Sequence, residues 1–175
     1  EELDLVYNTI HLNIDNKDIT DAQNVAKLLN IKHSVFNLEN LFEQQVISKF
    51  VEGYLNGITP NPCIFCNKHV KFGALLDYAK SHKCSKLATG HYALIEYDPA
   101  SKRFLIKRPT DSHKDQTYVL CFLTQEQLSH VIFPLASTTK QETRKLAQHL
   151  GLPVFNKPES QDICFIKNAN TQSMF

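Results

Sequence analysis

Apolar residues recur at helical spacing in four stretches of the chain, each bounded by polar or helix-breaking residues. In the second stretch Phe42, Val46, Phe50 and Tyr54 step by four, so they lie on one face of a helix. The last stretch opens on a capping-box pattern and is closed by a glycine. The spacing predicts four helices, over residues 18–30, 40–55, 72–79 and 139–150.

Short apolar runs between these stretches predict strands at residues 5–7, 34–37, 86–89 and 154–155, the third of them buried. Residues 92–97 and 103–107 flank Asp98-Pro99-Ala100-Ser101, which is typical of strand, turn and strand. Residues 117–123 fit a strand and a helix equally well. Strands that alternate with helices predict an α/β fold with a mostly parallel sheet.

The composition is that of an ordinary globular domain of 175 residues with a net charge of +1. No apolar run approaches the roughly 20 residues that span a bilayer, and the acidic start is unlike a targeting peptide. Five cysteines, an odd number, favour a reducing compartment, so we expect a cytoplasmic protein, with a mitochondrial one as the alternative. The chain begins inside a strand without methionine. We therefore expect a piece of a longer protein, with one catalytic domain over 1–165 and a linker starting at 166–175.

The first candidate for chemistry is Cys63-Ile64-Phe65-Cys66, and we expect the proline-rich loop at 59–62 to carry both of these cysteines. This spacing occurs in redox motifs, in half of a zinc site and in iron–sulfur sites. A closed zinc site would need two more ligands; His82 and Cys84 lie nearby in sequence, but there is no second closely spaced pair. Two buried thiols are a further alternative, although a proline-rich loop is a poor place for burial. The loop therefore favours a functional role.

The second candidate is Cys164, which lies between apolar residues after a polar loop. On its own it is typical of a core cysteine. Paired with the distant Cys66, it indicates a redox or sulfur-transfer couple.

Two further segments are candidates for ligand contacts. Gly90 ends a strand in Ala88-Thr89-Gly90-His91-Tyr92, and ligands of α/β sheets bind at the carboxyl ends of strands. An ordinary glycine turn is the alternative. Residues 102–116 are the most basic stretch, which Lys68 and Lys71 could extend. They are candidates for phosphate contacts, or form a solvated hairpin face.

Taken together and in order, six short stretches resemble the tRNA-specific 2-thiouridylase family: residues 57–68, 70–72, 88–92, 114–118, 133–135 and 159–166. The resemblance implies an adenine-nucleotide alpha-hydrolase-like α/β domain of the ATP pyrophosphatase type. It implies that ATP, with Mg²⁺, adenylates the C2 oxygen of the wobble uridine of tRNA. Sulfur from a donor protein then arrives as a persulfide and replaces that oxygen.

The resemblance also implies roles for individual residues. Cys66 matches the nucleophile and Cys164 the persulfide carrier, and the two would form a disulfide during the reaction. Gly90 matches the ATP site. The residues that match the target-base contact are Asn61, Pro62 and Cys63, and those that match a tRNA contact are Lys114, Asp115 and Gln116. No resident metal ion is implied.

The chain departs from the family at two points. Many members have Asp where this chain has Cys63, which opens a rival reading in which Cys63, Cys66 and Cys164 ligate an iron–sulfur cluster. The Ser-Gly-Gly-x-Asp-Ser loop that cradles ATP phosphates, and the later tRNA-binding domains, are not in this chain. We therefore expect the domain to be incomplete at its N-terminus and the fragment alone to be inactive. The remaining rivals are another ATP pyrophosphatase acting on a different carbonyl and a metal- or iron–sulfur-binding RNA module.

Overall fold

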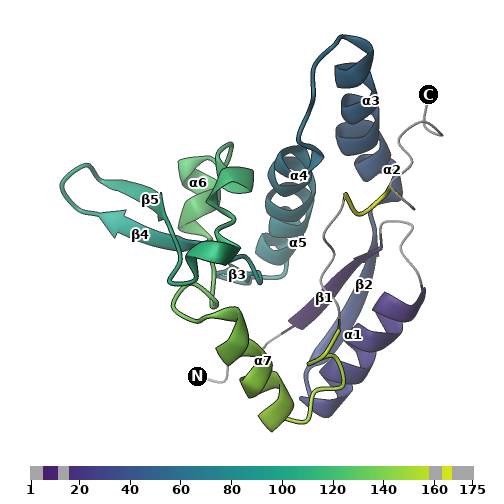
Figure 1. Ribbon diagram of the computed structural model, residues 1–175, viewed down its shortest axis with the longest axis vertical. Helices are drawn as coiled ribbons and strands as arrows, with labels where there is room; N and C mark the ends of the chain where they lie inside the picture. Colours follow the sequence, from purple (N-terminus) through teal and green to yellow (C-terminus); the bar gives the residue numbers. More distant parts are fainter. Residues whose placement is uncertain (1–5, 12–15, 158–162, 167–175) are drawn as a thin grey trace. The chain divides into compact units, whose positions relative to one another are not determined.

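The computed structural model describes residues 6–11, 16–157 and 163–166 (Figure 1). The chain forms two compact units. Unit 1 consists of Glu1–Glu43 and Arg144–Phe175, and unit 2 of Gln44–Thr143. The expected linker beyond residue 166 and the polar residues 159–162 of the second cysteine motif lie outside the described residues.

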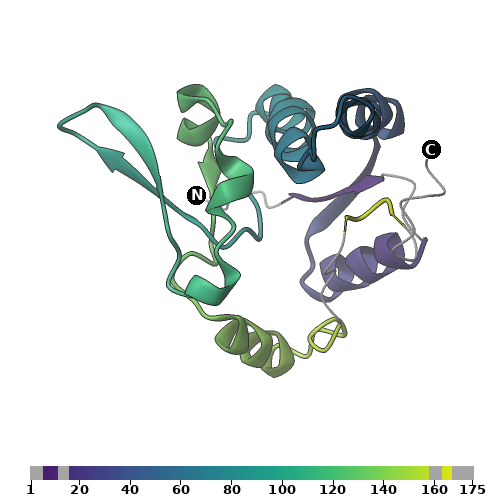
Figure 2. The ribbon, with the colours of Figure 1, turned by 45° about the horizontal axis from the view of Figure 1, so that its top comes forward.

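Unit 1 is built on a strand–helix–strand motif. Strand β1 (Val6–His11) pairs in parallel with β2 (Lys32–Asn37), and helix α1 (Asn16–Leu28) connects them and packs on one face (Figures 1 and 2). Ala22 and Ala26 give α1 a buried side, since small side chains let the helix approach the strands closely. The predicted first helix and first two strands are confirmed.

A second helical stretch consists of α2 (Glu39–Phe42), the π-helical η1 (Glu43–Ile47) and α3 (Ser48–Leu55). Phe42, Val46 and Phe50 are buried as the apolar stripe predicts. Tyr54 remains 37% exposed and packs edge-on against Phe50, with ring centroids 4.9 Å apart.

Unit 2 is organised around a long helix made of α4 (Pro62–Phe65), the π-helical η2 (Cys66–Ala74) and α5 (Leu75–Ser81). Strands β3 (Leu87–Ala88) and β6 (Val131–Ile132) pair in parallel. Strands β4 (Leu94–Asp98) and β5 (Arg103–Lys107) form the predicted antiparallel hairpin, which projects from the unit (Figures 1 and 2). The buried core consists of Phe72, Ala93, Val119, Leu120, Val131 and Phe133.

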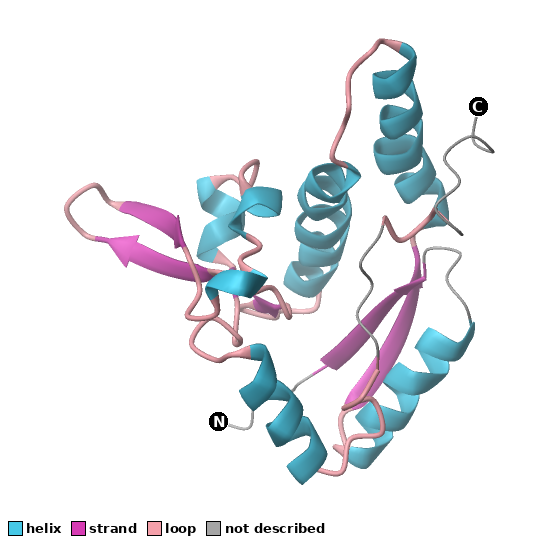
Figure 3. Cartoon of the chain, viewed as in Figure 1, coloured by secondary structure: helices cyan, strands magenta, loops and turns pink. Residues whose placement is uncertain are grey.

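Short helices connect these strands. They are the 3₁₀ turns η3 (Ser112–Lys114) and η4 (Thr117–Leu120) and helix α6 (Gln125–Ser129) (Figure 3). Helix α7 (Lys140–His149) follows, and Thr139 and Glu142 form its predicted capping box, with hydrogen bonds of 2.7–3.2 Å. Together, helices between parallel strand pairs confirm the α/β class.

Three predictions of local structure are wrong. The loop at 59–62 does not carry the two cysteines, because proline is tolerated at the first helical position and the helix already begins at Pro62. Residues 154–155 lie in turns instead of a strand. The β3 strand is not buried, since Leu87 is half-buried and Ala88 exposed. The ambiguous segment 117–123 begins as a 3₁₀ turn.

Candidate functional site

The cysteine helix of unit 2 starts with a side-chain cap. Asn61 Oδ1 accepts a hydrogen bond of 3.1 Å from the backbone N–H of Cys63, and Pro62 is buried at the first helical position. Cys63 is exposed at the helix start, and Cys66 lies one turn later and is buried, with 8% of its surface accessible. The four-residue motif thus presents one thiol to solvent and the other to the interior.

Cys66 opens the π-helical segment, and its neighbour Asn67 ties that segment to η4. The Nδ2 of Asn67 donates to the Val119 carbonyl at 3.2 Å, and only 2% of Asn67 is exposed. Its Oδ1 is buried without a hydrogen-bond partner, the only such side-chain atom among the described residues. Buried polar groups normally have partners, so this oxygen is an unused acceptor next to the proposed nucleophile.

The loop after β3 carries Gly90 on the surface of unit 2. A Cβ added there would lie 3.8 Å from Leu135 Cδ1, an ordinary contact, so the protein itself does not require glycine. The adjacent His91 is buried between the rings of Phe72 and Phe133, at 5.6 and 5.7 Å. Burial, and secondarily the Lys71 charge, lowers the pKa of His91 to about 3, so its ring is neutral.

The segment predicted to contact tRNA is bonded to this loop. Gln116 Oε1 accepts from the backbone N–H of Tyr92 at 2.9 Å, and the Gln116 N–H donates to the Tyr92 carbonyl at 3.0 Å. Asp115 Oδ1 accepts from the Thr117 N–H at 2.9 Å. Hydrogen bonds from Thr117 and the charge of Arg108 lower the pKa of Asp115. Both side chains therefore organise the turn, and Lys114 at the end of η3 is half-buried.

The basic stretch is partly neutralised within the hairpin. Lys107 Nζ lies 2.6 Å from Glu96 Oε1, and Arg108 Nε lies 3.5 Å from Asp115 Oδ2. Next to the cysteine motif, Lys68 Nζ lies over the ring of Phe122, 5.5 Å from its centroid, and 53% of Phe122 is exposed. A cation over an exposed ring is a combination that single-stranded RNA binds well.

Cys164 belongs to unit 1, whereas Cys66 belongs to unit 2. Cys164 is exposed, and the next residue, Phe165, packs edge-on against Phe42 with centroids 5.7 Å apart. None of the five cysteines is joined in a disulfide. The approach of Cys66 to Cys164 stays a prediction.

The described residues contain no group of three or more His, Cys, Asp or Glu that could hold a metal ion. The two residues named from the sequence as possible further zinc ligands, His82 and Cys84, contact each other through the Cys84 Sγ and the His82 carbonyl, 4.0 Å apart. In the same part of the chain, no helix combines the length and apolarity needed to cross a membrane.

Two residues that shape the site, Asn67 and Gln127, were not predicted from the sequence. Asn67 lies inside a quoted motif, but its hydrogen bond spans 52 positions and leaves no periodic trace. Gln127 had a local signal, because Thr124 and Gln127 form a capping box of the type found at Thr139 and Glu142.

Comparison with known proteins gives a consistent result. A family model described as "tRNA methyl transferase HUP domain" matches residues 5–168. The "tRNA-specific 2-thiouridylase MnmA 1" of Thermoanaerobacter pseudethanolicus is 51% identical over 148 residues, which cover 85% of this chain and 41% of that protein. The "tRNA-specific 2-thiouridylase MnmA" of Moorella thermoacetica is 49% identical over 150 residues, covering 86% and 42%. The chain thus spans about two fifths of the length of these relatives.

Proposed function

Because the chain belongs to the tRNA methyl transferase HUP domain family, which includes the tRNA-specific 2-thiouridylases, we propose that it is the catalytic part of an ATP-dependent tRNA-uridine 2-sulfurtransferase. The HUP-domain match, with its parallel strand pairs, confirms the predicted nucleotide alpha-hydrolase-like α/β fold. The observation that carries the proposal is that the matched range, 5–168, spans both Cys66 and Cys164 in a chain half identical to named thiouridylases. A cytoplasmic location fits the odd number of cysteines.

The first step we propose is activation of the uridine. The C2 oxygen of a pyrimidine is a poor leaving group, and transfer of AMP from ATP makes it a good one, with pyrophosphate released. Gly90 is the proposed contact for ATP, because it is exposed after β3 and has no Cβ to keep a ligand from the backbone. Magnesium would enter bound to the phosphates of ATP.

The second step is sulfur transfer. A donor protein leaves an outer sulfur on Cys164 as a persulfide. The Cys66 thiolate attacks the inner sulfur, a Cys66–Cys164 disulfide forms, and the outer sulfur leaves as hydrosulfide. Hydrosulfide replaces the adenylated oxygen at C2, AMP departs, and a thiol reductant returns both cysteines to the reduced form. The exposure of Cys164 supports its role as the carrier, because a donor protein must reach it.

For tRNA, we propose that the target base is turned out of its loop towards the start of α4. The proposed base contacts are Asn61, Pro62 and Cys63, and exposed Cys63 is the most accessible of them. Of Lys114, Asp115 and Gln116, the lysine is best suited to a phosphate, because it alone of the three carries a positive charge. Lys114→Ala should weaken tRNA binding and reduce its salt dependence.

The decisive experiment replaces each proposed cysteine by serine in a full-length protein that carries this chain. Cys66→Ser and Cys164→Ser should each abolish 2-thiouridine in tRNA, measured by nucleoside mass spectrometry, while ATP binding stays nearly unchanged. Cys121→Ser is the matched control, because Cys121 is an exposed thiol outside the quoted cysteine motifs. Normal thiolation in either of the first two variants would refute the assignment.

The iron–sulfur alternative makes a different prediction. Cys63, Cys66 and Cys164 would then hold a cluster, and anaerobically purified protein would contain iron in stoichiometric amount and show a visible absorption band. A cluster that is required for thiolation would replace the persulfide scheme.

A further inference from the structure

The helix that carries Cys66 contains a stretch of nine π-helical residues, Cys66–Ala74. In a π-turn each backbone N–H bonds to the fifth preceding carbonyl instead of the fourth, so one residue is added to the turn. An added residue changes the direction of the preceding side chains about the helix axis by about 100°. The π-turn therefore sets where Cys66 and Asn67 point relative to the core residues of α5.

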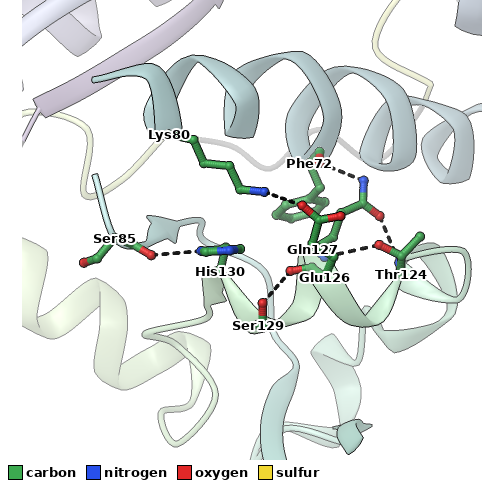
Figure 4. A network of polar contacts seen from close by, with 8 residues as sticks. All are labelled: Phe72, Lys80, Ser85, Thr124, Glu126, Gln127, Ser129 and His130. Carbon is green, nitrogen blue, oxygen red and sulfur yellow. Dashed lines mark hydrogen bonds and ion pairs between the residues drawn. The ribbon is translucent and has the colours of Figure 1, made fainter. Parts of the chain in front are cut away.

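One side chain outside this helix holds the π-turn. Gln127 of α6 donates from Nε2 to the Phe72 carbonyl at 2.7 Å (Figure 4). The same Nε2 donates to the Lys68 carbonyl at 3.3 Å. Both carbonyls lie within η2, after Cys66. π-Helical stretches are rare and occur mostly as single turns, so a donor that bridges two carbonyls of such a segment stabilises an otherwise unfavourable geometry.

The orientation of Gln127 is fixed by the start of its own helix. Its Oε1 accepts from the Thr124 N–H at 2.9 Å, and its own N–H donates to Thr124 Oγ1 at 3.2 Å. The capping box thus directs the amide nitrogen towards η2 (Figure 4). A second amide acts on the same segment, because Asn67 donates to the Val119 carbonyl of η4.

The crowding around the Lys68 carbonyl supports this interpretation. A Cβ at Gly73 would lie 3.1 Å from that oxygen, closer than most such contacts. The absence of a side chain at Gly73 and the donor on Gln127 therefore favour the same local geometry.

We propose that Gln127 is a positioning residue for Cys66: its amide holds the π-turn and thereby fixes the direction in which the Cys66 thiol leaves the helix. This rests on the proposed role of Cys66 as nucleophile. Displacement of a reacting atom by about 1 Å can lower a rate by about a hundredfold. We therefore expect the hydrogen bonds from Gln127 to η2 to affect the reaction rate more than the stability of the fold.

The test compares three variants of a full-length protein that carries this chain. Gln127→Glu keeps an oxygen that can accept from Thr124 and loses the donors to η2. Thr124→Ala removes only the hydroxyl that accepts from the Gln127 backbone N–H, and it keeps the Thr124 backbone N–H that orients the Gln127 side chain, so the donors to η2 stay in place. Glu126→Gln, on the neighbouring residue, removes an exposed ion pair with Lys80 (2.8 Å) and serves as the surface control (Figure 4).

For Gln127→Glu we expect the single-turnover rate of 2-thiouridine formation to fall about 10- to 100-fold. The KM values for ATP and tRNA should stay within about twofold. Glu126→Gln should leave the single-turnover rate unchanged. Thr124→Ala should lower the melting temperature of the protein without a comparable loss of that rate. If Thr124→Ala slows the reaction as much as Gln127→Glu at an equal melting temperature, Gln127 is merely structural and the proposal is overturned.

A second readout does not need activity. The reaction of Cys66 with a pyridyl disulfide, followed by peptide mass spectrometry, should become several-fold faster in Gln127→Glu, because the loosened turn exposes this buried thiol. The difference should shrink from pH 8 to pH 5, since a protonated glutamic acid can again donate one hydrogen bond. An unchanged rate at both pH values contradicts the proposal.

Two safeguards keep the outcome interpretable. If Gln127→Glu does not fold, Gln127→Met removes the same donors without placing a carboxylate against two carbonyls, and the same results are expected except for the pH effect. If Cys66→Ser still thiolates tRNA, the proposed function is wrong. The pyridyl disulfide reaction would still test whether Gln127 controls the accessibility of the Cys66 thiol.

Discussion

The two cysteines of the proposed reaction have contrasting surroundings. Cys66 is 8% exposed, and its helix is tied to other elements of unit 2 by the amides of Asn67 and Gln127. Cys164 is exposed in a turn of unit 1, beside a ring pair of Phe165 and Phe42. A nucleophile benefits from a fixed direction, whereas a persulfide carrier has to be reached by a donor and then by the nucleophile. The contrast supports the two different roles.

The largest expected effect is a loss of stability, and it should be greater for a truncated ring near Cys66 than for one near Cys164. Phe72→Ala removes a buried ring from the core of unit 2 and should lower the free energy of unfolding by about 3–5 kcal/mol. Phe165→Ala, next to Cys164, removes one half-buried ring contact and should cost about 1 kcal/mol. Urea denaturation followed by circular dichroism measures both. Equal losses would show that the carrier region is packed as firmly as the nucleophile region.

The second prediction concerns the pH dependence of stability that arises from His91, the buried neutral residue that follows Gly90. Its pKa is about 3 in the folded protein and near 6.5 when unfolded, so below pH 6.5 the unfolded chain binds the extra proton. His91 should therefore reduce stability as pH falls from 6.5 towards 3, with a slope of about 1.4 kcal/mol per pH unit inside that window. His91→Gln should remove this part of the slope in urea midpoints measured between pH 7 and pH 4. A slope that persists in the variant would assign it to other groups.

The third prediction concerns the thiols directly. In wild-type protein without tRNA, Cys164 should react with a maleimide about tenfold faster than Cys66, because exposure controls access to the sulfur. Peptide mass spectrometry after short labelling times gives both rates, and exposed Cys121 provides an internal reference. Faster labelling of Cys66 would reverse the contrast on which the assignment of roles depends.

The smallest expected effect lies in unit 1. Lys157 Nζ donates to Asp18 Oδ1 at 2.5 Å and to Asp21 Oδ2 at 2.6 Å, and these hydrogen bonds to the two carboxylates raise the pKa of Lys157. All three side chains are partly exposed, so Lys157→Ala should cost only about 0.5 kcal/mol, and less at 1 M salt. A loss above about 2 kcal/mol would show that this bridge holds the segment that precedes Cys164 far more firmly than an exposed ion pair does.

Sequence patterns predicted the helices and strands whose apolar residues recur at a regular spacing. The stripe of Phe42, Val46 and Phe50 and the alternation in the 94–107 hairpin come from burial on one face, so they are visible in a single segment. Val154 and Phe155 have strong β-propensity but no partner strand among the described residues, and they lie in turns.

The candidate site was harder to predict in detail. The cysteine motif and Gly90 are local and were found, whereas the π-turn after Cys66 breaks the 3.6-residue period on which helix prediction depends. The bonds of Asn67 to Val119 and of Gln127 to Phe72 join positions 52 and 55 residues apart. Contacts of this kind follow from tertiary packing, and only the Thr124 capping box left a trace in the sequence.

The pair of hydrogen bonds between Gln116 and Tyr92 has a consequence for ligand binding. They join the loop that carries Gly90 to the segment that carries Lys114, so the backbone proposed to lie next to ATP and the backbone proposed to contact tRNA form a single ordered piece. The conformational entropy of this piece is lost once, when the protein folds. Neither proposed ligand then has to order its loop on binding, so the order in which the two bind should not change this entropy cost.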